Sequence, residues 1–324
     1  MIRRALIVFC ILLVATSCSK KKEPAAASGR HVKLALNWVP EPEFGGFYAA
    51  RESGAFGKHG LDVEIQGGGA GVPVVQMVAS GQADFGIVGA DELLMARARG
   101  ADVIPVFATF QTSPQGIMAH ASRGAKNVGD VLKSGTLAIE PGLPYAAFLK
   151  KKYGFAGVSI VPYDGGVARF MLDSNMAQQC YVTAEPLAAK KKGGDPQVFL
   201  VADEGFNPYV GVVVVSRKTW NENAADVKGF VSAAREGWKA YDDDPKPTNA
   251  VMRKLNASMD EATFAEAAAA QKPLIEGPDA QAHGIGAMTK ERWDTLGKQL
   301  ADLALIDKVP ASGDYLVTVE TVVP

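Results

Sequence analysis

Apolar and polar residues alternate along this chain in short runs, and most runs are followed by a stretch with helical spacing. HVKLALN (31–37) and GLDVEIQGG (60–68) place apolar residues at every second position, which predicts strands with one buried face. Three intervening stretches predict helices: GFYAARESGAF (46–56), VPVVQMVASG (72–81) and DELLMARARG (91–100). Further strands are predicted at 83–90, 102–110 and 116–120.

A second cycle of the same kind begins near residue 127 and ends in VGVVVVSRKTW (210–220), after which 223–306 is almost wholly helical. Strands that alternate with helices form mostly parallel sheets, with helices on both faces. We therefore expect an α/β protein with two lobes and a helical C-terminal region. The expected division is 31–118 with 212–324 as lobe I and 119–211 as lobe II.

The first thirty residues have a different pattern, typical of an export signal. Arg3 and Arg4 precede the apolar run ALIVFCILLV (5–14), which is too short to span a membrane. ATSC (15–18) then resembles a bacterial lipobox, with Ala15 where Leu is usual, and this implies a signal peptide over 1–17 and a lipid on Cys18. The alternative is a plain cleaved signal with an incidental thiol. The polar segment 18–30 is expected to be a flexible tether.

Composition excludes some classes of function and leaves others open. The chain has 324 residues, is 48% hydrophobic and carries a net charge of −1, which argues against a nucleic-acid partner. Cys180 is the single cysteine after Cys18, so no disulfide is expected within the folded part. The four histidines are scattered and no metal-binding or nucleophile motif is present, so we expect no cofactor, no metal and no catalysis.

The candidate chemistry lies in the segments that follow the strands. In open α/β sheets, ligands bind outside the carboxyl ends of the strands. These segments are rich in aromatic, acidic and amide side chains, which suit a small, polar, partly aromatic ligand. The candidate ligand-binding residues are Asn37, Trp38, Glu43, Tyr48, Glu92, Gln115, Tyr145, Tyr163, Asp164, Glu185, Asn207 and Tyr209.

Several of these residues have a second interpretation. Trp38 either stacks on a ligand ring or packs beneath its own loop as part of the core. Glu43, Glu92 and Glu185 either accept hydrogen bonds from a ligand or interact with the N-terminal ends of helices.

Four stretches together resemble the solute-binding proteins of ABC importers, in the branch that includes binders of thiamine pyrimidine precursors and of sulfonate or nitrate. They are LNWVPEPEFGGFYAARESGAFGKHGLDVEI, VVQMVASGQADFGIVGADELLMARARG, QQCYVTAEPLAAKKKG and VFLVADEGFNPYVGVVVVS, and the resemblance covers about 31–275. It implies a type II periplasmic-binding-protein fold, capture of a ligand by hinge closure, and delivery to a membrane permease. It also implies a monomer, held by its lipid at a membrane facing the periplasm or the cell exterior.

The pyrimidine branch resembles this chain more closely than the anion branch, because it carries a first-loop motif, an acid after the third strand, and later T-x-E-P and N-P-Y segments. The counterparts here are Asn37, Trp38, Pro40, Glu43, Gly46, Glu92, Glu185, Asn207, Pro208 and Tyr209. The resemblance implies that Trp38 stacks on a heteroaromatic ring and that Glu43, Glu92 or Glu185 accepts from ring amino groups. An anion-binding protein of the same fold is the alternative. It is weakened by Pro144, which offers no backbone N–H at a helix start. A fungal pyrimidine synthase also shares the fold, but its cysteine-rich segment is absent here.

Overall fold

The computed structural model describes residues 29–317, 319, 322 and 323 of the chain. The predicted signal peptide, Cys18 and nearly all of the predicted tether therefore lie outside the described residues. In the part that is described, no helix combines the length and the apolar character needed to cross a membrane.

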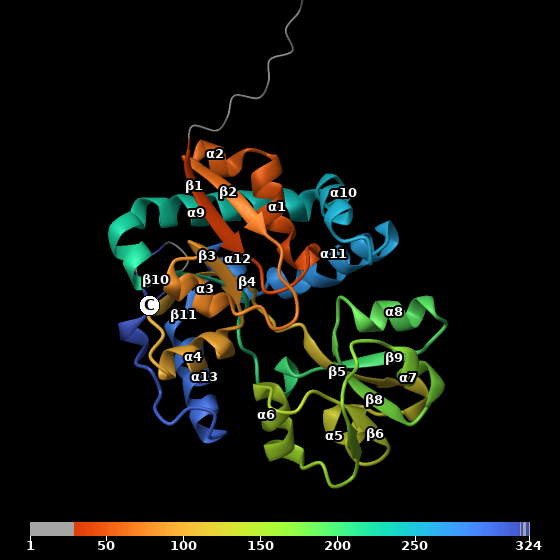
Figure 1. Cartoon of the computed structure of the whole chain (residues 1–324). Coiled ribbons are helices and arrows are strands. Elements are labelled where there is room, and N and C mark those ends of the chain that lie inside the picture. Colours follow the sequence, from red (N-terminus) through yellow and green to blue (C-terminus); the bar gives the residue numbers. More distant parts are fainter. Residues whose placement is uncertain (1–28, 318, 320–321, 324) are drawn as a thin grey trace, which may run out of the picture.

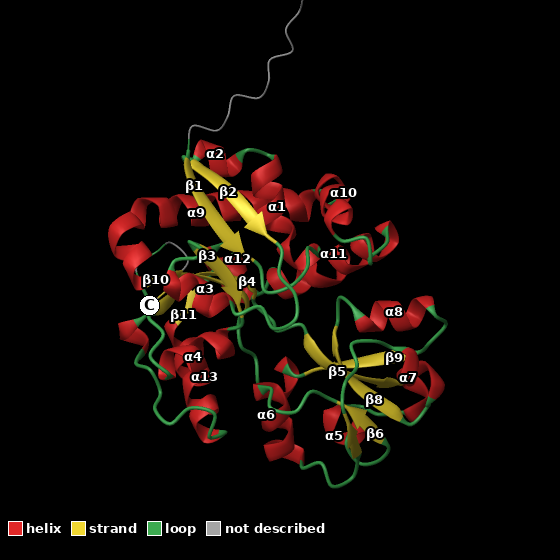
Figure 2. Ribbon diagram, viewed as in Figure 1, coloured by secondary structure: helices red, strands yellow, loops and turns green. Residues whose placement is uncertain are grey.

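Two five-stranded sheets form the framework (Figures 1 and 2). The first has the order β2 (Leu61–Gln66), β1 (Arg30–Ala35), β3 (Phe85–Val88), β10 (Val210–Ser216), β4 (Val103–Phe110). The second has the order β7 (Ser159–Val161), β6 (Thr136–Ala138), β8 (Met176–Tyr181), β5 (Gln115–His120), β9 (Pro196–Leu200). A small pair, β11 (Met288–Thr289) and β12 (Val322–Val323), lies apart from both.

Each large sheet is parallel except around one strand. β10 runs antiparallel to β3 and β4, and β5 runs antiparallel to β8 and β9. β10 joins the first sheet only after the chain has completed the second, so the backbone crosses between the sheets twice, at 111–114 and at 201–209. We call residues 29–110 with the described residues from 210 onward the large half, and residues 115–200 the small half.

The expected division at residue 118 falls inside β5, whose strand belongs wholly to the second sheet. The sequence misplaces this limit because β4 and β5 are both apolar and only four residues separate them. The expected return at 212 likewise falls within β10.

Helices cover both sheets, as the alternating pattern predicts. Those of the large half are α1 (Gly45–Glu52), α2 (Ala55–Lys58), α3 (Val74–Ser80), α4 (Ala90–Ala98), α9 (Arg217–Asp243), α10 (Lys246–Leu255), α11 (Glu261–Ile275), α12 (Pro278–His283) and α13 (Lys290–Asp302). Those of the small half are α5 (Val128–Val131), α6 (Pro144–Tyr153), α7 (Ala168–Leu172) and α8 (Glu185–Lys191). Short 3-10 turns occur at Pro42–Phe44, Ala121–Arg123, Ala202–Glu204 and Ser312–Asp314.

The predicted helix over 46–56 is two helices, because Gly54 adopts a left-handed conformation (φ 75°) between α1 and α2. The glycines at the start of α1 are required for close packing and not for a left-handed backbone conformation. A Cβ on Gly45 would lie 2.3 Å from the Tyr241 ring, and one on Gly46 would lie 2.2 Å from the Trp238 ring. These glycines let α1 approach α9 closely, so the first helix is fixed against the C-terminal helical region.

Candidate functional site

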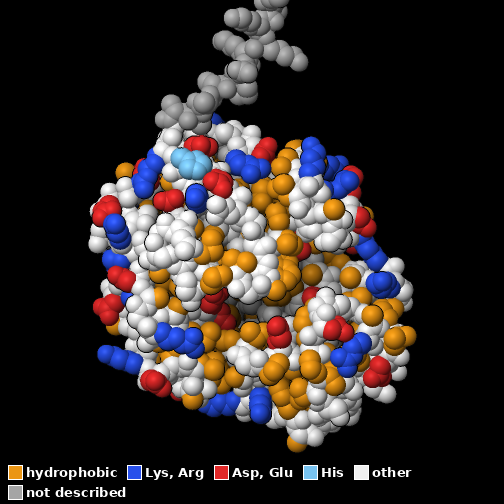
Figure 3. All heavy atoms as spheres, in the orientation of Figure 1, with side chains coloured by type: hydrophobic (Ala, Val, Ile, Leu, Met, Phe, Trp, Pro, Cys, Tyr) orange, Lys and Arg blue, Asp and Glu red, His pale blue; other side chains and the backbone are white. Residues whose placement is uncertain are grey.

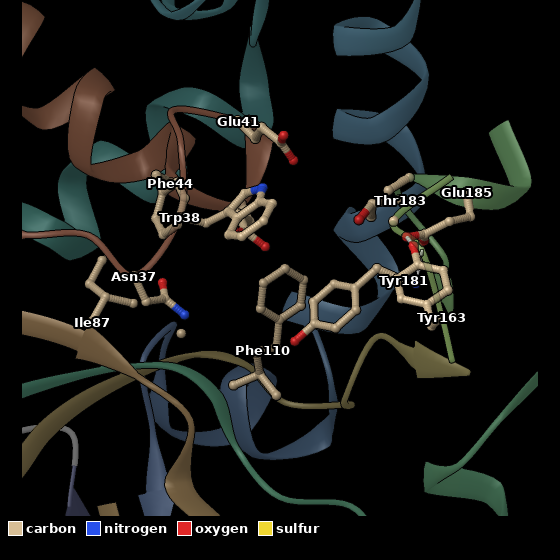
Figure 4. Close-up of a pocket in the computed structure, with 15 residues that line it drawn as sticks. Asn37, Trp38, Glu41, Phe44, Ile87, Phe110, Tyr163, Tyr181, Thr183 and Glu185 are labelled. Atoms are coloured by element: carbon tan, nitrogen blue, oxygen red, sulfur yellow. Dashed lines mark hydrogen bonds between the residues drawn. The ribbon is translucent and has the colours of Figure 1, made fainter. Parts of the chain in front are cut away.

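A cavity of about 300 Å³ lies between the two halves. Its walls come from the loop after β1, the ends of β4, β7 and β8, the start of β10 and the first turn of α8. Figure 4 shows Trp38 and Phe110 on the large-half side and Tyr181, Tyr163 and Glu185 on the small-half side. The lining residues are Asn37, Trp38, Glu41, Glu43, Phe44, Ile87, Phe110, Tyr163, Gly165, Tyr181, Thr183, Ala184, Glu185, Val210 and Gly211.

Trp38 lines this cavity and keeps 42% of its surface exposed. Its loop is nevertheless held firmly. Gly68 donates its N–H to the Trp38 carbonyl (2.9 Å) and lies so close to Leu36 that a Cβ would meet the Leu36 carbonyl at 2.0 Å. The indole of Trp38 is therefore an exposed side chain on a fixed loop and is not part of the core.

Two buried amides from the C-terminal helical region also hold the loop. Asn256 donates to the Pro40 carbonyl (3.2 Å), and Gln271 donates to the Pro42 carbonyl (2.8 Å). The Pro42 carbonyl also accepts the Gly45 N–H that ends the 3-10 turn, so it has both a backbone and a side-chain partner. The loop therefore presents Trp38 and the neighbouring acids in one conformation.

The carboxyl groups on this loop are shielded from water. Burial raises the pKa of Glu43 to about 8, and the nearby Glu41 charge adds to that effect. Burial raises the pKa of Glu41 to about 7, opposed by a hydrogen bond from the Trp38 indole and reinforced by the Glu185 charge across the cavity. Acids from both halves thus act on one another through the cavity, and each raised pKa favours the protonated carboxyl group.

On the opposite wall, Glu185 organises the small-half side. Its Oε2 accepts the backbone N–H of Tyr181 (2.7 Å), and its Oε1 accepts the Tyr163 hydroxyl. Burial and the Glu185 charge raise the pKa of the Tyr163 phenol, which therefore stays protonated. This one carboxylate therefore holds the Tyr163 ring and the backbone at Tyr181.

The structure brings five of the predicted residues into the cavity wall: Asn37, Trp38, Glu43, Tyr163 and Glu185. Gln115 and Tyr145 line smaller hollows beside it. Glu92 borders none of these three spaces and lies in the first turn of α4, where burial raises its pKa to about 6.

Four predicted ligand contacts lie elsewhere, namely Tyr48, Tyr209, Asp164 and Asn207. Tyr48 is 1% exposed and packs in the core on α1, with Arg51 over its ring. Tyr209 is equally buried, and its hydroxyl accepts the Thr289 N–H (2.9 Å). Asp164 accepts from Gly166 N within its own turn and does not line the cavity.

Asn207 joins the two crossing segments and lines neither the cavity between the halves nor the two hollows beside it. Its Oδ1 accepts the N–H of Ser113 (2.8 Å), and its Nδ2 donates to the Gln111 carbonyl (3.5 Å). Its side chain therefore ties together the two places where the chain passes from one half to the other.

Sequence reasoning missed Glu41, Phe110, Tyr181 and Thr183, which all line the cavity. Phe110 and Tyr181 are the last residues of their strands, so the rule that ligands bind beyond strand ends could have found them. Glu41 precedes the 3-10 turn in the same loop as Glu43. Nothing in the sequence indicates which of the two acids lines the cavity. In the structure both Glu41 and Glu43 line it.

The charges around the cavity are of one sign. No Lys, Arg or His is among the described residues that line it, and Figure 3 shows acidic atoms in and beside the central hollow. Within the described ranges, no group of three or more His, Cys, Asp or Glu side chains is arranged to hold a metal ion.

Comparison with known families and curated proteins gives related binding proteins. A family model described as NMT1/THI5 like matches residues 41–248. The formylaminopyrimidine-binding protein of Halalkalibacterium halodurans is 23% identical over 262 residues, 78% of each chain. The riboflavin-binding protein RibY of Chloroflexus aurantiacus is 27% identical over 251 residues, 70% of each chain.

Solved structures give the same fold with lower identity. The periplasmic aliphatic sulphonate binding protein SsuA of Escherichia coli aligns with a TM-score of 0.67 at 16% identity, covering 90% of this chain and 93% of that one. The desulfurization enzyme DSZB aligns with a TM-score of 0.59 at 14% identity, covering 88% and 96%. The fold predicted from the sequence, that of periplasmic binding proteins, is confirmed, and it hosts both binding proteins and an enzyme.

Proposed function

Because the chain belongs to the NMT1/THI5-like family, we propose that it is an extracytoplasmic solute-binding protein of an ABC importer. It captures a small heteroaromatic ligand bearing amino groups, such as a thiamine pyrimidine precursor or a related compound. The two curated relatives, named for binding a pyrimidine and a flavin, support an aromatic heterocycle as the ligand class.

The observation that carries this proposal is the composition of the cavity wall. Trp38, Phe110 and Tyr181 offer ring faces, while Glu41, Glu43 and Glu185 offer acceptors for amino groups. Asn37 adds a carbonyl oxygen, Oδ1, that makes no hydrogen bond to the described residues. A flat ring with exocyclic N–H groups satisfies both kinds of wall.

Capture requires the halves to act as two lobes that move about a hinge. The segments 111–114 and 201–209 are the hinge in this proposal, and Asn207 couples them. A ligand that contacts both halves favours the closed arrangement, because only there does it gain the contacts of both walls. The closed form is then recognised by a membrane permease, and a lipid on Cys18 keeps the protein at the membrane.

The two alternatives lack support from the cavity. A sulfonate or nitrate ligand needs a cation or a row of free backbone donors, and no Lys, Arg or His of the described chain lines the cavity. An enzyme of this fold needs an activated group. Burial raises the pKa of the Cys180 thiol well above its usual range and so keeps it protonated and unreactive.

A thermal-shift panel tests the proposal. Aminopyrimidines, riboflavin, aliphatic sulfonates, taurine and amino acids are added to the purified chain at equal concentration. We expect an aromatic heterocycle to raise the melting temperature by a few degrees, since a ligand at about a hundred times its Kd adds roughly 2.7 kcal/mol. Sulfonates are expected to give no shift. A shift from sulfonates alone, or from no compound, contradicts the proposal.

A further inference from the structure

Behind Tyr181 the cavity continues into a second space. A hollow of about 280 Å³ shares Tyr181 and Glu185 with the main cavity, and a smaller one shares Asn37, Tyr181 and Val210 with it. We call the larger hollow the acid chamber. Its polar walls are Asp91, Gln115, Glu140, Tyr145, Gln179 and Glu185.

Three side-chain donors of the acid chamber are already engaged by the protein. The Tyr145 hydroxyl donates to Gln179 Oε1 (2.7 Å), and Gln179 Nε2 donates to Glu140 Oε2 (3.3 Å). Gln115 Nε2 donates to the Cys180 carbonyl (3.1 Å). A ligand arm in this chamber finds few free donors.

Acceptors remain free in the same chamber. Glu140 Oε1, Asp91 Oδ2 and Gln115 Oε1 accept no hydrogen bond from the described residues. No Lys, Arg or His of the described chain lines the acid chamber or the smaller hollow. Glu140 is exposed, and Asp91 and Gln115 are half-buried, so these oxygens are open to the space beside them. A ligand that donates to them forms charge-assisted or neutral hydrogen bonds without displacing a protein partner.

Acids of the main cavity and of the acid chamber come from both halves. The charge of Glu185 in the small half raises the pKa of Glu41 in the large half. Burial raises the pKa of the Tyr181 phenol in the small half, and the charges of Glu43 and Asp91 in the large half add to that effect. Where Glu41 and Glu185 both carry charge, their repulsion resists closure, and positive charge placed between them relieves it.

We propose that the ligand has two parts: a heteroaromatic ring in the main cavity, and a positively charged arm, such as an ammonium or amidinium group, that enters the acid chamber. The positive charge then serves closure as well as affinity, because it bridges acids from both halves. This inference rests on the proposed function and specifies the chemical class of its ligand.

Isothermal titration with a matched pair of probes tests it. The probes are one aminopyrimidine carrying an aminomethyl arm and the same ring carrying a hydroxymethyl arm, which have nearly equal size and differ in charge. We expect the aminomethyl probe to bind at least about ten-fold more tightly, as charge-assisted hydrogen bonds predict.

A variant pair locates the arm. Glu140 is exposed at the edge of the chamber, so Glu140→Gln is expected to fold normally and to remove most of the preference for the aminomethyl probe. Asp203→Asn removes the same charge from an exposed site outside all three spaces, and is expected to leave the preference unchanged. Equal affinity for the two probes, or a preference that Glu140→Gln leaves intact, overturns this inference while the proposed function stands. If neither probe binds and no other aromatic compound of the panel binds, the proposed function fails as well.

Discussion

Trp38 leaves much of an indole in contact with solvent, although its loop is tied by Gly68, Asn256 and Gln271. Removal of its ring therefore takes little packing from the folded protein. We expect Trp38→Ala to lower affinity for the preferred aromatic ligand by about ten-fold or more, the value of a lost ring contact in a desolvated site. The melting temperature of the ligand-free protein is expected to change little.

Calorimetric titration and a thermal melt of the same sample measure both quantities. Leu172→Ala, at a side chain that is 88% exposed on α7, is the control for the loss of an exposed apolar group. A large loss of stability with unchanged affinity would place Trp38 in the core after all.

Glu43 makes the stability of the ligand-free protein depend on pH. Its pKa is about 8 in the folded protein and near 4.5 in the unfolded chain, so the folded state binds more protons between these values. The free energy of unfolding therefore falls as pH rises from about 5 to 8. Glu43→Gln is expected to flatten this fall and to melt a few degrees above wild type at pH ~8.5.

Thermal melts of both proteins across this pH range check the sign. Glu222→Gln, at an exposed acid on α9, is the matched control and should follow wild type. A Glu43→Gln variant that is less stable than wild type at high pH would show that this carboxylate is favourably paired.

The residues that sequence reasoning placed well are those next to strand ends, because parallel strands bring their carboxyl ends together. Tyr48 and Tyr209 were misplaced for a different reason. Tyr48 lies within α1, where the rotation of the helix decides which way a side chain points, and a short motif does not fix that rotation. Tyr209 immediately precedes β10, and a ring contact with Arg292 accompanies its burial.

At the level of elements, the contact between α1 and α9 supports the loop after β1, which carries Trp38 and leads into α1. A Cβ on Gly46 would overlap the Trp238 ring, which is itself fully buried and unable to move aside cheaply. We expect Gly46→Ala to destabilise the protein by roughly 1–3 kcal/mol, the usual range for overpacking, with a lower melting temperature.

Gly57→Ala is the matched control for this change. Gly57 also lies in a helix, and a Cβ there would meet nothing within 4 Å. This variant should melt at or slightly above the wild-type temperature, since Ala is the better helix former. Equal melting of both variants would mean that α1 and α9 can separate without cost.

Element type was predictable from the sequence, because the periods of strands and helices differ. Element limits were less so. One helix was expected over 46–56 where Gly54 divides two, and the crossing between the sheets was placed inside β5. Both errors arise where apolar runs continue through a change of direction that a single glycine or a four-residue link produces.

For the whole molecule, an ion pair links the two halves outside the cavity. Lys191 at the end of α8 lies 2.8 Å from Asp260 Oδ1, the N-cap of α11, and also contacts Thr263. Exposed pairs of this kind are weak and are screened by salt. We expect Lys191→Ala to speed ligand dissociation by roughly two- to five-fold at low salt, with the difference lost near 1 M salt.

Stopped-flow dissociation of the preferred ligand measures this rate. Lys190→Ala is the control, since Lys190 is exposed and has no contact with the large half among the interactions of the described chain. Equal dissociation rates for the two variants would remove the ion pair from the closing mechanism.

The central claim is that this family member holds a heteroaromatic ligand between its two halves. A crystal structure of the complex with the aromatic compound that gives the largest thermal shift tests it most directly. The account predicts a ring against Trp38, with hydrogen bonds to carboxylates of both the β1 loop and the start of α8. A ligand bound outside this cavity, or held there by backbone N–H groups with its ring away from Trp38, would contradict it.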